Sequence, residues 1–218
     1  MPAKLIAFDL DGTLINSIPG IANSVNRTRE ALGAAPLPYE TICNYVGNGS
    51  RKLAERSFAD LLQTHDFEGL HAQMVFNYTK EPIFGTLPYP GVLEGLDRLK
   101  HAEIILTVVS NKPSAVGSSI LRELGIGAFI DDNIGCGNDF PLKPAPDALL
   151  FLLDKYQISP TDAWIFGDNY TDIEAGINAG IHTAFADYGY GKLHDQDAEL
   201  HVASFAEFVA AMLASHPV

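Results

Sequence analysis

Short apolar runs rich in β-branched residues alternate along this chain with longer segments of helical periodicity. The strand-like runs cover residues 5–10, 104–110, 163–167 and 182–186. The helical patterns between and after them cover residues 92–101, 114–124, 147–156, 172–179 and 205–213. Such alternation is typical of a parallel sheet with helices on both faces. The pattern therefore predicts an α/β fold with a doubly wound, Rossmann-like parallel sheet.

One long stretch, from about residue 15 to residue 88, interrupts this alternation and contains no convincing strand. Its helical patterns cover residues 18–32, 39–46, 53–62 and 70–78, and prolines stand near both of its ends. We therefore expect an all-helical cap domain at residues 16–88. It would be inserted into a core domain formed by residues 1–15 and 89–218.

Charge and composition narrow the range of partners. The chain has 218 residues, with 27 acidic and 14 basic side chains and a net charge of −13. So acidic a chain is a poor nucleic-acid binder, because phosphate backbones attract basic surfaces. No apolar run is long enough to span a bilayer, and the first strand-like run follows the N-terminus without a signal-peptide pattern. We expect a cytoplasmic protein with Cys43 and Cys136 reduced.

Two carboxylates follow the first strand-like run. Asp9 and Asp11 stand one residue apart, and Gly12 comes directly after them. Ligands of doubly wound sheets bind at the carboxyl ends of strands. Such a pair of acids can hold a hard cation, attack an electrophile or transfer a proton. An ordinary solvated turn explains the Asp-Gly pair equally well, so this segment alone leaves the choice open.

Three further segments carry comparable groups. Ser110 and Asn111 end a second strand-like run, Lys143 is held between loop residues rich in proline, and Asp168 and Asp172 follow a third strand-like run. Each segment has a plain explanation as a loop or a helix start. Together, however, acids and phosphate-binding groups at three strand ends predict one crevice that binds a metal ion and an anion.

These four segments, in their order along the chain, carry a resemblance to a known family. The motifs DLDGT, SNK, KPAP and GDNYTD resemble those of the haloacid dehalogenase superfamily of phosphotransferases, and the likeness covers essentially the whole chain. The helical insert is similar to the cap domain of one branch. The resemblance implies that Asp9 is the nucleophile, forming an aspartyl-phosphate, and that Asp11 is the general acid and base.

The resemblance also implies the ligand sets. Mg²⁺ would be bound by Asp9, by the backbone carbonyl of Asp11 and by Asp168, with Asp172 in direct or supporting contact. Substrate binding is assigned to Gly12, Thr13, Ser110, Asn111 and Lys143. Among these, Ser110 and Asn111 would hold the phosphoryl oxygens, and Lys143 would neutralise them.

Some positions distinguish branches of the superfamily. Asp11 argues against dehalogenases and phosphonoacetaldehyde hydrolases, which lack an acid there. Ile21 stands where phosphosugar mutases carry a cap histidine. The cap segment 45–56 is similar to that of phosphoglycolate phosphatases. In it Arg51, Lys52 or Arg56 could bind a substrate carboxylate, or these side chains could simply cover the helix surface.

The sequence thus predicts a Mg²⁺-dependent phosphomonoester hydrolase of a small anionic phosphorylated metabolite, and the resemblance favours a phosphoglycolate phosphatase. Two alternatives of the same class are a phosphatase or pyrophosphatase for another small phosphate and a β-phosphoglucomutase-like phosphosugar mutase. An alternative of another class is a non-catalytic protein that binds a small ligand on the same scaffold. No nucleic-acid or membrane partner is expected, and the oligomeric state is expected to be a monomer or a homodimer.

Overall fold

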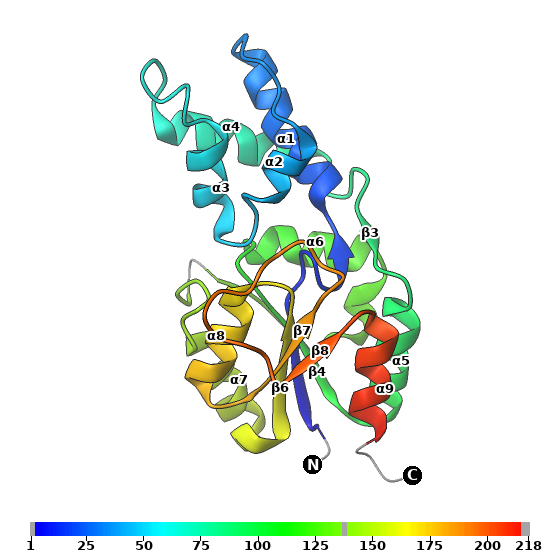
Figure 1. Cartoon of the computed structure of the whole chain (residues 1–218). Helices are drawn as coiled ribbons and strands as arrows, with labels where there is room; N and C mark the ends of the chain where they lie inside the picture. The colour runs from blue at the N-terminus through cyan, green and yellow to red at the C-terminus, as the bar shows by residue number, and fades with distance from the viewer. Residues whose placement is uncertain (1–2, 137–138, 215–218) are drawn as a thin grey trace.

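A six-stranded parallel sheet forms the centre of the protein in this computed structural model, which describes residues 3–136 and 139–214 (Figure 1). The strand order is β5-β4-β1-β6-β7-β8. Its strands are β1 (Leu5–Phe8), β4 (Ile105–Ser110), β5 (Asp132–Gly135), β6 (Ala163–Gly167), β7 (His182–Ala186) and β8 (Leu200–Val202). All neighbouring strands pair in parallel. The predicted α/β fold with a parallel sheet is confirmed.

Helices cover both faces of this sheet. Their bounds are α5 (Val92–His101), α6 (Ser114–Glu123), α7 (Asp147–Tyr156), α8 (Tyr170–Ala179) and α9 (Phe205–Ala214). In β1, Ile6 and Phe8 pack into the core shared with α5, α6 and α9, whereas Leu5 and Ala7 pack into the core shared with α7 and α8. Because successive residues of a strand point to opposite faces, a strand buried on both sides must be apolar throughout.

Four helices form a separate layer above the carboxyl ends of the strands (Figure 1). They are α1 (Ile18–Ala31), α2 (Tyr39–Cys43), α3 (Gly49–Ser57) and α4 (Phe67–Lys80). These helices share a hydrophobic core of their own, centred on Val25, Ile42 and Phe58. Buried Arg29 links two of their segments through a bidentate pair with Asp60.

A short ribbon joins the helical layer to the sheet domain. Strands β2 (Ile15–Asn16) and β3 (Leu87–Pro88) pair in an antiparallel manner. The expectation of no strand in this stretch was therefore wrong at its two ends, where the chain leaves the sheet domain and returns. The exact division into domains at residues 16 and 88 stays a prediction.

Several predicted bounds are corrected by the structure. Strand β1 ends at Phe8, although the strand-like run was expected to continue to Leu10, because the chain bends at Leu10 and turns at Gly12. Helix α3 begins at Gly49 and ends at Ser57, so the expected helix 53–62 was misplaced towards the C-terminus. Helix α4 begins at Phe67, where the Asp66 side chain accepts a hydrogen bond from Gly69 N and caps the helix.

Two expectations from composition can be compared with the structure. Cys43 and Cys136 are both free thiols, as expected. Among the helices of the described ranges, none combines the length and the apolar character that crossing a bilayer requires.

Candidate active site

The site lies where the direction of the sheet winding reverses. The chain runs from β1 to β4 and β5 on one side and then crosses to β6 on the other side of β1. Asp9 directly follows β1, Ser110 is the last residue of β4, and Asp168 directly follows β6. The predicted chemistry therefore gathers at the carboxyl ends of three adjacent strands, where doubly wound sheets bind their ligands.

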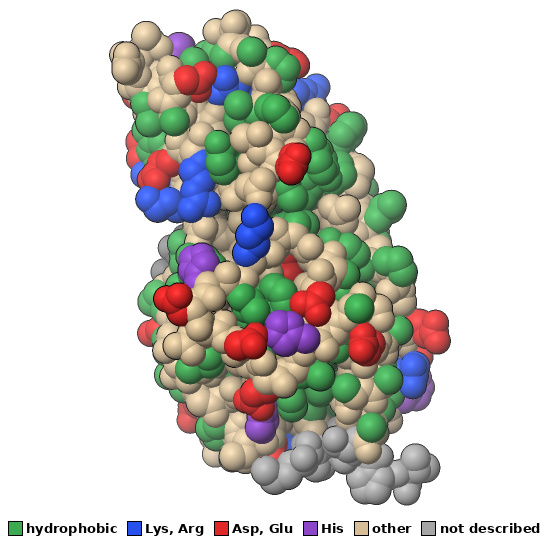
Figure 2. Space-filling model, in the orientation of Figure 1, with side chains coloured by type: hydrophobic (Ala, Val, Ile, Leu, Met, Phe, Trp, Pro, Cys, Tyr) green, Lys and Arg blue, Asp and Glu red, His purple; other side chains and the backbone are tan. Residues whose placement is uncertain are grey.

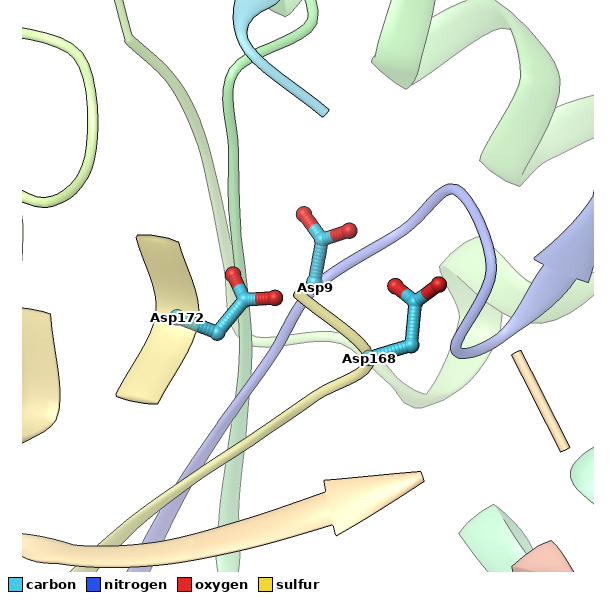
Figure 3. Close-up of side chains that lie close together, drawn as sticks. All are labelled: Asp9, Asp168 and Asp172. Carbon is cyan, nitrogen blue, oxygen red and sulfur yellow. The ribbon is translucent and has the colours of Figure 1, made fainter. Parts of the chain in front are cut away.

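Three carboxylates meet at this point. Figure 3 shows the side chain of Asp9 between those of Asp168 and Asp172. One oxygen of each acid lies within 4.8 Å of the others, and all three residues are buried. The predicted convergence of these acids is thus present in the structure.

The loop after β7 and the turn after β1 hold Asp168 in place. Asp168 Oδ2 accepts hydrogen bonds from the backbone N–H groups of Tyr190, at 2.9 Å, and Gly191, at 2.7 Å. On its other side Gly12 has a φ of +90°, and a Cβ there would lie 2.2 Å from Asp168 Oδ2. The hydroxyl of buried Thr13 is 3.4 Å from Asp168 Oδ1. Gly12 and Thr13 therefore contact Asp168, and neither is among the residues that line the cavity described below. Their assignment to substrate binding stays a prediction.

Asp172 serves two structural roles at once. Its Oδ2 accepts a hydrogen bond from the backbone N–H of Asn169 and completes a capping box at the start of α8. Its Oδ1 accepts a hydrogen bond from Lys143 Nζ at 2.6 Å. The capping box explains why α8 begins at Tyr170, earlier than predicted.

Lys143 is the cation at the centre of the cluster. Its ammonium donates to Asp9 Oδ1 at 2.8 Å, to Asp172 Oδ1 and to the carbonyl of Val109. Burial alone would lower the pKa of Lys143, but the charges of Asp172 and Asp9 outweigh this and hold that pKa above its ordinary value. All three N–H groups of the ammonium are used, so Lys143 stays charged and points at Asp9.

Burial and mutual repulsion act on the carboxylates. Burial raises the pKa of Asp9 to about 7, against the lowering effect of Lys143. The charges of Asp172 and Asp11 add to this rise. Burial also raises the pKa of Asp168 well above its ordinary value, and Asp9 and Asp172 add to it. Such a cluster resists full ionisation, and a divalent cation among its oxygens would relieve the repulsion.

Asp11 faces a different environment from the other acids. Its Oδ1 accepts a hydrogen bond from Ser17 Oγ, and its Oδ2 lies 3.0 Å from Lys112 Nζ. The hydroxyl of Tyr190 is 3.3 Å from Ser17 Oγ. The Asp11 side chain thus belongs to a separate polar network beside the cluster.

A cavity of about 100 Å³ lies above these acids, between the helical layer and the sheet domain. Its walls on the sheet side include Asp9, Asp11, Ser110, Asn111, Lys112, Lys143 and Asp168. Its walls on the helical side include Ile21, Ser24, Val46, Ser50, Leu53, Met74, Val75 and Tyr78. The cavity is therefore small, charged at its floor and mainly apolar at its roof, which suits a small ligand with an anionic head.

Comparisons with known proteins agree with this arrangement. Residues 6–186 match the family described as haloacid dehalogenase-like hydrolase. The chain belongs to this family. The prediction of a haloacid dehalogenase superfamily phosphatase is confirmed.

Individual relatives resemble this hydrolase along nearly its whole length. It is 39% identical to a protein named phosphoglycolate phosphatase from Psychrobacter arcticus, over 87% of this chain and 86% of that protein. It is 34% identical to one of the same name from Aquifex aeolicus, with 96% of each chain covered. The crystal structure of a predicted phosphoglycolate phosphatase from Haemophilus somnus superposes with a TM-score of 0.90 at 29% identity, covering 96% of this chain and 97% of that one.

Ser110, the last residue of β4, and Asn111, which follows it, have different hydrogen-bond partners in this hydrolase. Ser110 is buried, lines the cavity and accepts a hydrogen bond from Lys112 N. The Asn111 side chain donates to the carbonyls of Gly47 and Lys143 and accepts from Lys143 N at 2.8 Å. Its amide therefore ties the helical layer to the Lys143 loop. Phosphoryl binding by Ser110 and Asn111 stays a prediction.

The basic residues predicted to meet the substrate from α3 do not line the cavity. Arg51 pairs with Glu68, and Lys52 pairs with Glu55; both basic side chains are 57% exposed. The reason is helix geometry, since both lie on the outer face of α3 while Ser50 and Leu53 face inwards. Substrate binding by Arg51 and Lys52 stays a prediction that this arrangement does not support.

Arg56 lies in a neighbouring hollow. Its guanidinium donates to the carbonyl of Tyr45 and to Asn48 Oδ1. Lys192 and His194 line the same hollow. On the face shown in Figure 2, basic side chains lie near the junction of the helical layer and the sheet domain, whereas acidic side chains dominate below it. Arg56 therefore contributes positive charge beside the cavity rather than inside it, and its role in binding stays a prediction.

Sequence reasoning assigned no role to three side chains in or beside this site: Lys112, Tyr78 and Tyr190. Lys112 belongs to the SNK motif, but the local sequence does not determine where its ammonium points. Tyr78 comes from α4, far away in sequence. Burial would lower the pKa of Lys112, but the charge of Asp11 and then Tyr78 raise it above its ordinary value. A second permanent cation is thus present on the cavity wall.

Proposed function

We propose that this phosphatase hydrolyses 2-phosphoglycolate with the help of Mg²⁺. The observation that supports this most strongly is the placement of Asp9 and Asp11 together on the floor of a cavity of about 100 Å³. A phosphoryl group would fit near Asp9, beneath a small and mostly apolar roof. The names of the relatives from Psychrobacter arcticus and Aquifex aeolicus support the choice of substrate.

The chain's own residues supply a complete set of groups for hydrolysis. Asp9 Oδ2 accepts no hydrogen bond from the described residues, whereas Lys143 holds Oδ1. In the proposed reaction an Asp9 oxygen attacks phosphorus, the ester P–O bond breaks, and the leaving oxygen takes a proton from Asp11. Water then attacks the phosphorylated Asp9, Asp11 accepts its proton, and inorganic phosphate leaves.

The donor set of the acidic cluster fits a magnesium ion. It consists only of carboxylate oxygens, the ligands that Mg²⁺ prefers. Lys143 pairs with two of these three buried acids, Asp9 and Asp172, so negative charge remains for a cation to balance. Asp9 and Asp168 would hold the ion, with the carbonyl of Asp11, and Asp172 would support them. When bound, the ion would neutralise phosphoryl charge.

The roof of the cavity supports hydrolysis over phosphosugar mutation. Ile21, at the position of the mutase histidine, lines the cavity and offers no group for proton transfer. Cytoplasmic location and a monomeric or homodimeric state stay predictions from the sequence.

A substrate panel tests the proposal. Phosphate release would be measured with 2-phosphoglycolate, glycerol phosphate, β-glucose 1-phosphate, pyrophosphate and 4-nitrophenyl phosphate, each with Mg²⁺ and with a chelator. We expect the highest kcat/KM for 2-phosphoglycolate and no turnover without the metal. Preference for another phosphate would reject the substrate assignment. Isomerised sugar phosphate would indicate a mutase, and no turnover of any compound would indicate a binding protein.

Replacement of Asp11 by Asn should reveal protonation of the leaving group. We expect kcat with 2-phosphoglycolate to fall by ~10²–10⁴, the usual contribution of general acid–base catalysis. For 4-nitrophenyl phosphate the loss in the first half-reaction should be much smaller, because nitrophenolate leaves without a proton. Single-turnover kinetics would separate the two half-reactions. Equal losses for both esters would contradict the role of Asp11 as the acid.

Magnesium should stabilise the metal-free protein. At a hundredfold excess over Kd, a ligand that binds only the native state adds about 2.7 kcal/mol, which for a chain of this size corresponds to roughly 5–10 °C in Tm. Thermal unfolding with and without Mg²⁺ would measure this shift. Asp168→Asn should lose most of it, because a cluster oxygen is removed. An unchanged Tm in the wild-type protein would argue against a metal site at these acids.

A further inference from the structure

Lys112 is a second lysine on the cavity wall with no role in the hydrolysis described above. Its side chain is only 7% exposed, and its ammonium lies 3.0 Å from Asp11 Oδ2. The same ammonium donates to the hydroxyl of Tyr78 at 3.0 Å and lies 4.5 Å from the centre of the Tyr78 ring. A buried ammonium is costly unless it is paired or has a ligand to bind.

The two lysines of the cavity differ in their remaining hydrogen-bonding capacity. An ammonium has three N–H donors. Lys143 uses all three on Asp9, Asp172 and the Val109 carbonyl. Within the described residues, Lys112 has two polar partners, Asp11 and Tyr78. One N–H of Lys112 is therefore available to a ligand in the cavity.

Tyr78 offers a matching donor. Its hydroxyl oxygen accepts the hydrogen bond from Lys112, which leaves the hydroxyl hydrogen to be donated elsewhere. Both residues line the cavity. An ammonium N–H and a phenol O–H with donor atoms 3.0 Å apart form a pair that suits the two oxygens of a carboxylate.

Because Lys112 and Tyr78 lie beside Asp11, they can bind a substrate carboxylate only if it is close to the leaving oxygen. Asp11 is the proposed acid for the leaving oxygen, and Lys112 lies beside it. In 2-phosphoglycolate one methylene carbon separates the leaving oxygen from the carboxylate carbon. A leaving oxygen at Asp11 would thus put the substrate carboxylate next to Lys112 and Tyr78. The basic residues of α3 offer no such contact, because Arg51 and Lys52 pair with surface acids.

We infer that Lys112 and Tyr78 bind the carboxylate of the substrate and thereby select phosphate esters with a carboxylate on the carbon next to the leaving oxygen. This inference rests on the proposed function. Lys112 comes from the loop after β4 and Tyr78 from α4 of the helical layer. The carboxylate site is complete only while the helical layer covers the sheet domain.

Two esters that differ only in the carboxyl group next to the leaving oxygen test this inference. They are 2-phosphoglycolate and its neutral amide, 2-phosphoglycolamide. For Lys112→Gln we expect kcat/KM for the acid to fall ~100-fold more than kcat/KM for the amide, the loss typical of a buried hydrogen bond to a charge. Tyr78→Phe, which retains the ring packing, should give a loss of the same selectivity of ~10-fold. Lys155→Gln, at a surface pair with Asp132, is the control and should change neither value.

The possible outcomes separate this inference from the proposed function. If both esters lose the same factor in Lys112→Gln and in Tyr78→Phe, these residues act through Asp11 or through packing, and the inference is rejected although the wild-type enzyme still hydrolyses 2-phosphoglycolate. Selective loss in Arg51→Ala or Arg56→Ala instead would assign the carboxylate to α3 and reject the inference. If the wild-type enzyme hydrolyses 2-phosphoglycolate no better than its amide, the inference is rejected while the proposed function stands; if it does not hydrolyse 2-phosphoglycolate at all, the proposed function fails and the inference fails with it.

Discussion

Asp9→Asn is expected to abolish turnover and to leave the fold intact. An amide cannot attack phosphorus as a carboxylate does, so kcat should fall by ~10⁴ or more, equivalent to at least about 5 kcal/mol of transition-state stabilisation. Phosphate release with 2-phosphoglycolate would measure the loss. A variant that retains a tenth of the activity or more would reject Asp9 as the nucleophile.

Stability provides the control for this variant. Asp9 is buried in a cluster where burial and like charges raise its pKa to about 7. Replacing the acid with a neutral isostere removes part of that repulsion, although Lys143 loses one acceptor charge. We expect the Tm of the metal-free Asp9→Asn protein to equal or exceed that of the wild type. A large fall in Tm would mean that lost activity reflects unfolding rather than a missing nucleophile.

Lys143→Met is expected to damage both stability and activity. The side chain of Lys143 is 1% exposed, and its ammonium pairs with Asp9 and Asp172. Removing one partner of a buried ionic network leaves uncompensated charge and typically costs about 3–5 kcal/mol. Urea unfolding of the metal-free protein would measure this loss. Lys4→Met, which breaks a pair with Asp162 in which Lys4 is 59% exposed, should cost less than about 1 kcal/mol.

The loss in Lys143→Met should depend on pH. The charge of Lys143 lowers the pKa of Asp9, so its removal raises that pKa further above the value of the unfolded chain. Between the two pKa values the native state binds more protons than the unfolded state, and stability therefore falls as pH rises. We expect a smaller deficit near pH 5 than near pH 8. A deficit independent of pH would mean that lost packing, rather than charge, destabilises the variant.

The bounds of four regular elements were predicted correctly. Strands β6 and β7 and helices α5 and α7 have the bounds that the hydrophobic pattern predicted. Strands β5 (Asp132–Gly135) and β8 (Leu200–Val202) were missed, and both stand at the edges of the sheet. An edge strand has one neighbour and is partly exposed, so it tolerates polar residues and its apolar pattern is weak.

The helical character of the cap segment was predicted correctly, but the first and last residues of its helices were predicted less well. Four helices occur where four were expected, yet α3 begins at Gly49 rather than at the predicted residue 53. Gly47 and Gly49 both have positive φ values. The hydrophobic pattern did not show that the second of these glycines starts a helix, because helix starts depend on local turns that periodicity does not report.

The residues on the floor of the cavity could be predicted from the sequence. Asp9, Ser110 and Asp168 each stand at the end of an apolar strand, and the carboxyl ends of adjacent parallel strands lie at one edge of the sheet. The pattern of strand ends was therefore enough to predict that Asp9, Ser110 and Asp168 converge. The family resemblance followed from the same residues, and the comparisons confirmed it.

The walls of the cavity were decided only by the tertiary structure. Lys112 follows Asn111 in sequence, and Arg51 looked the better candidate for a carboxylate, yet Lys112 lies in the cavity and Arg51 pairs with Glu68 at the surface. The direction of a side chain on a loop or helix depends on how that element is rotated and packed against distant segments such as α4. The end of a strand can be located from the local hydrophobic pattern. A site between two layers, by contrast, forms only when both layers have folded and packed together.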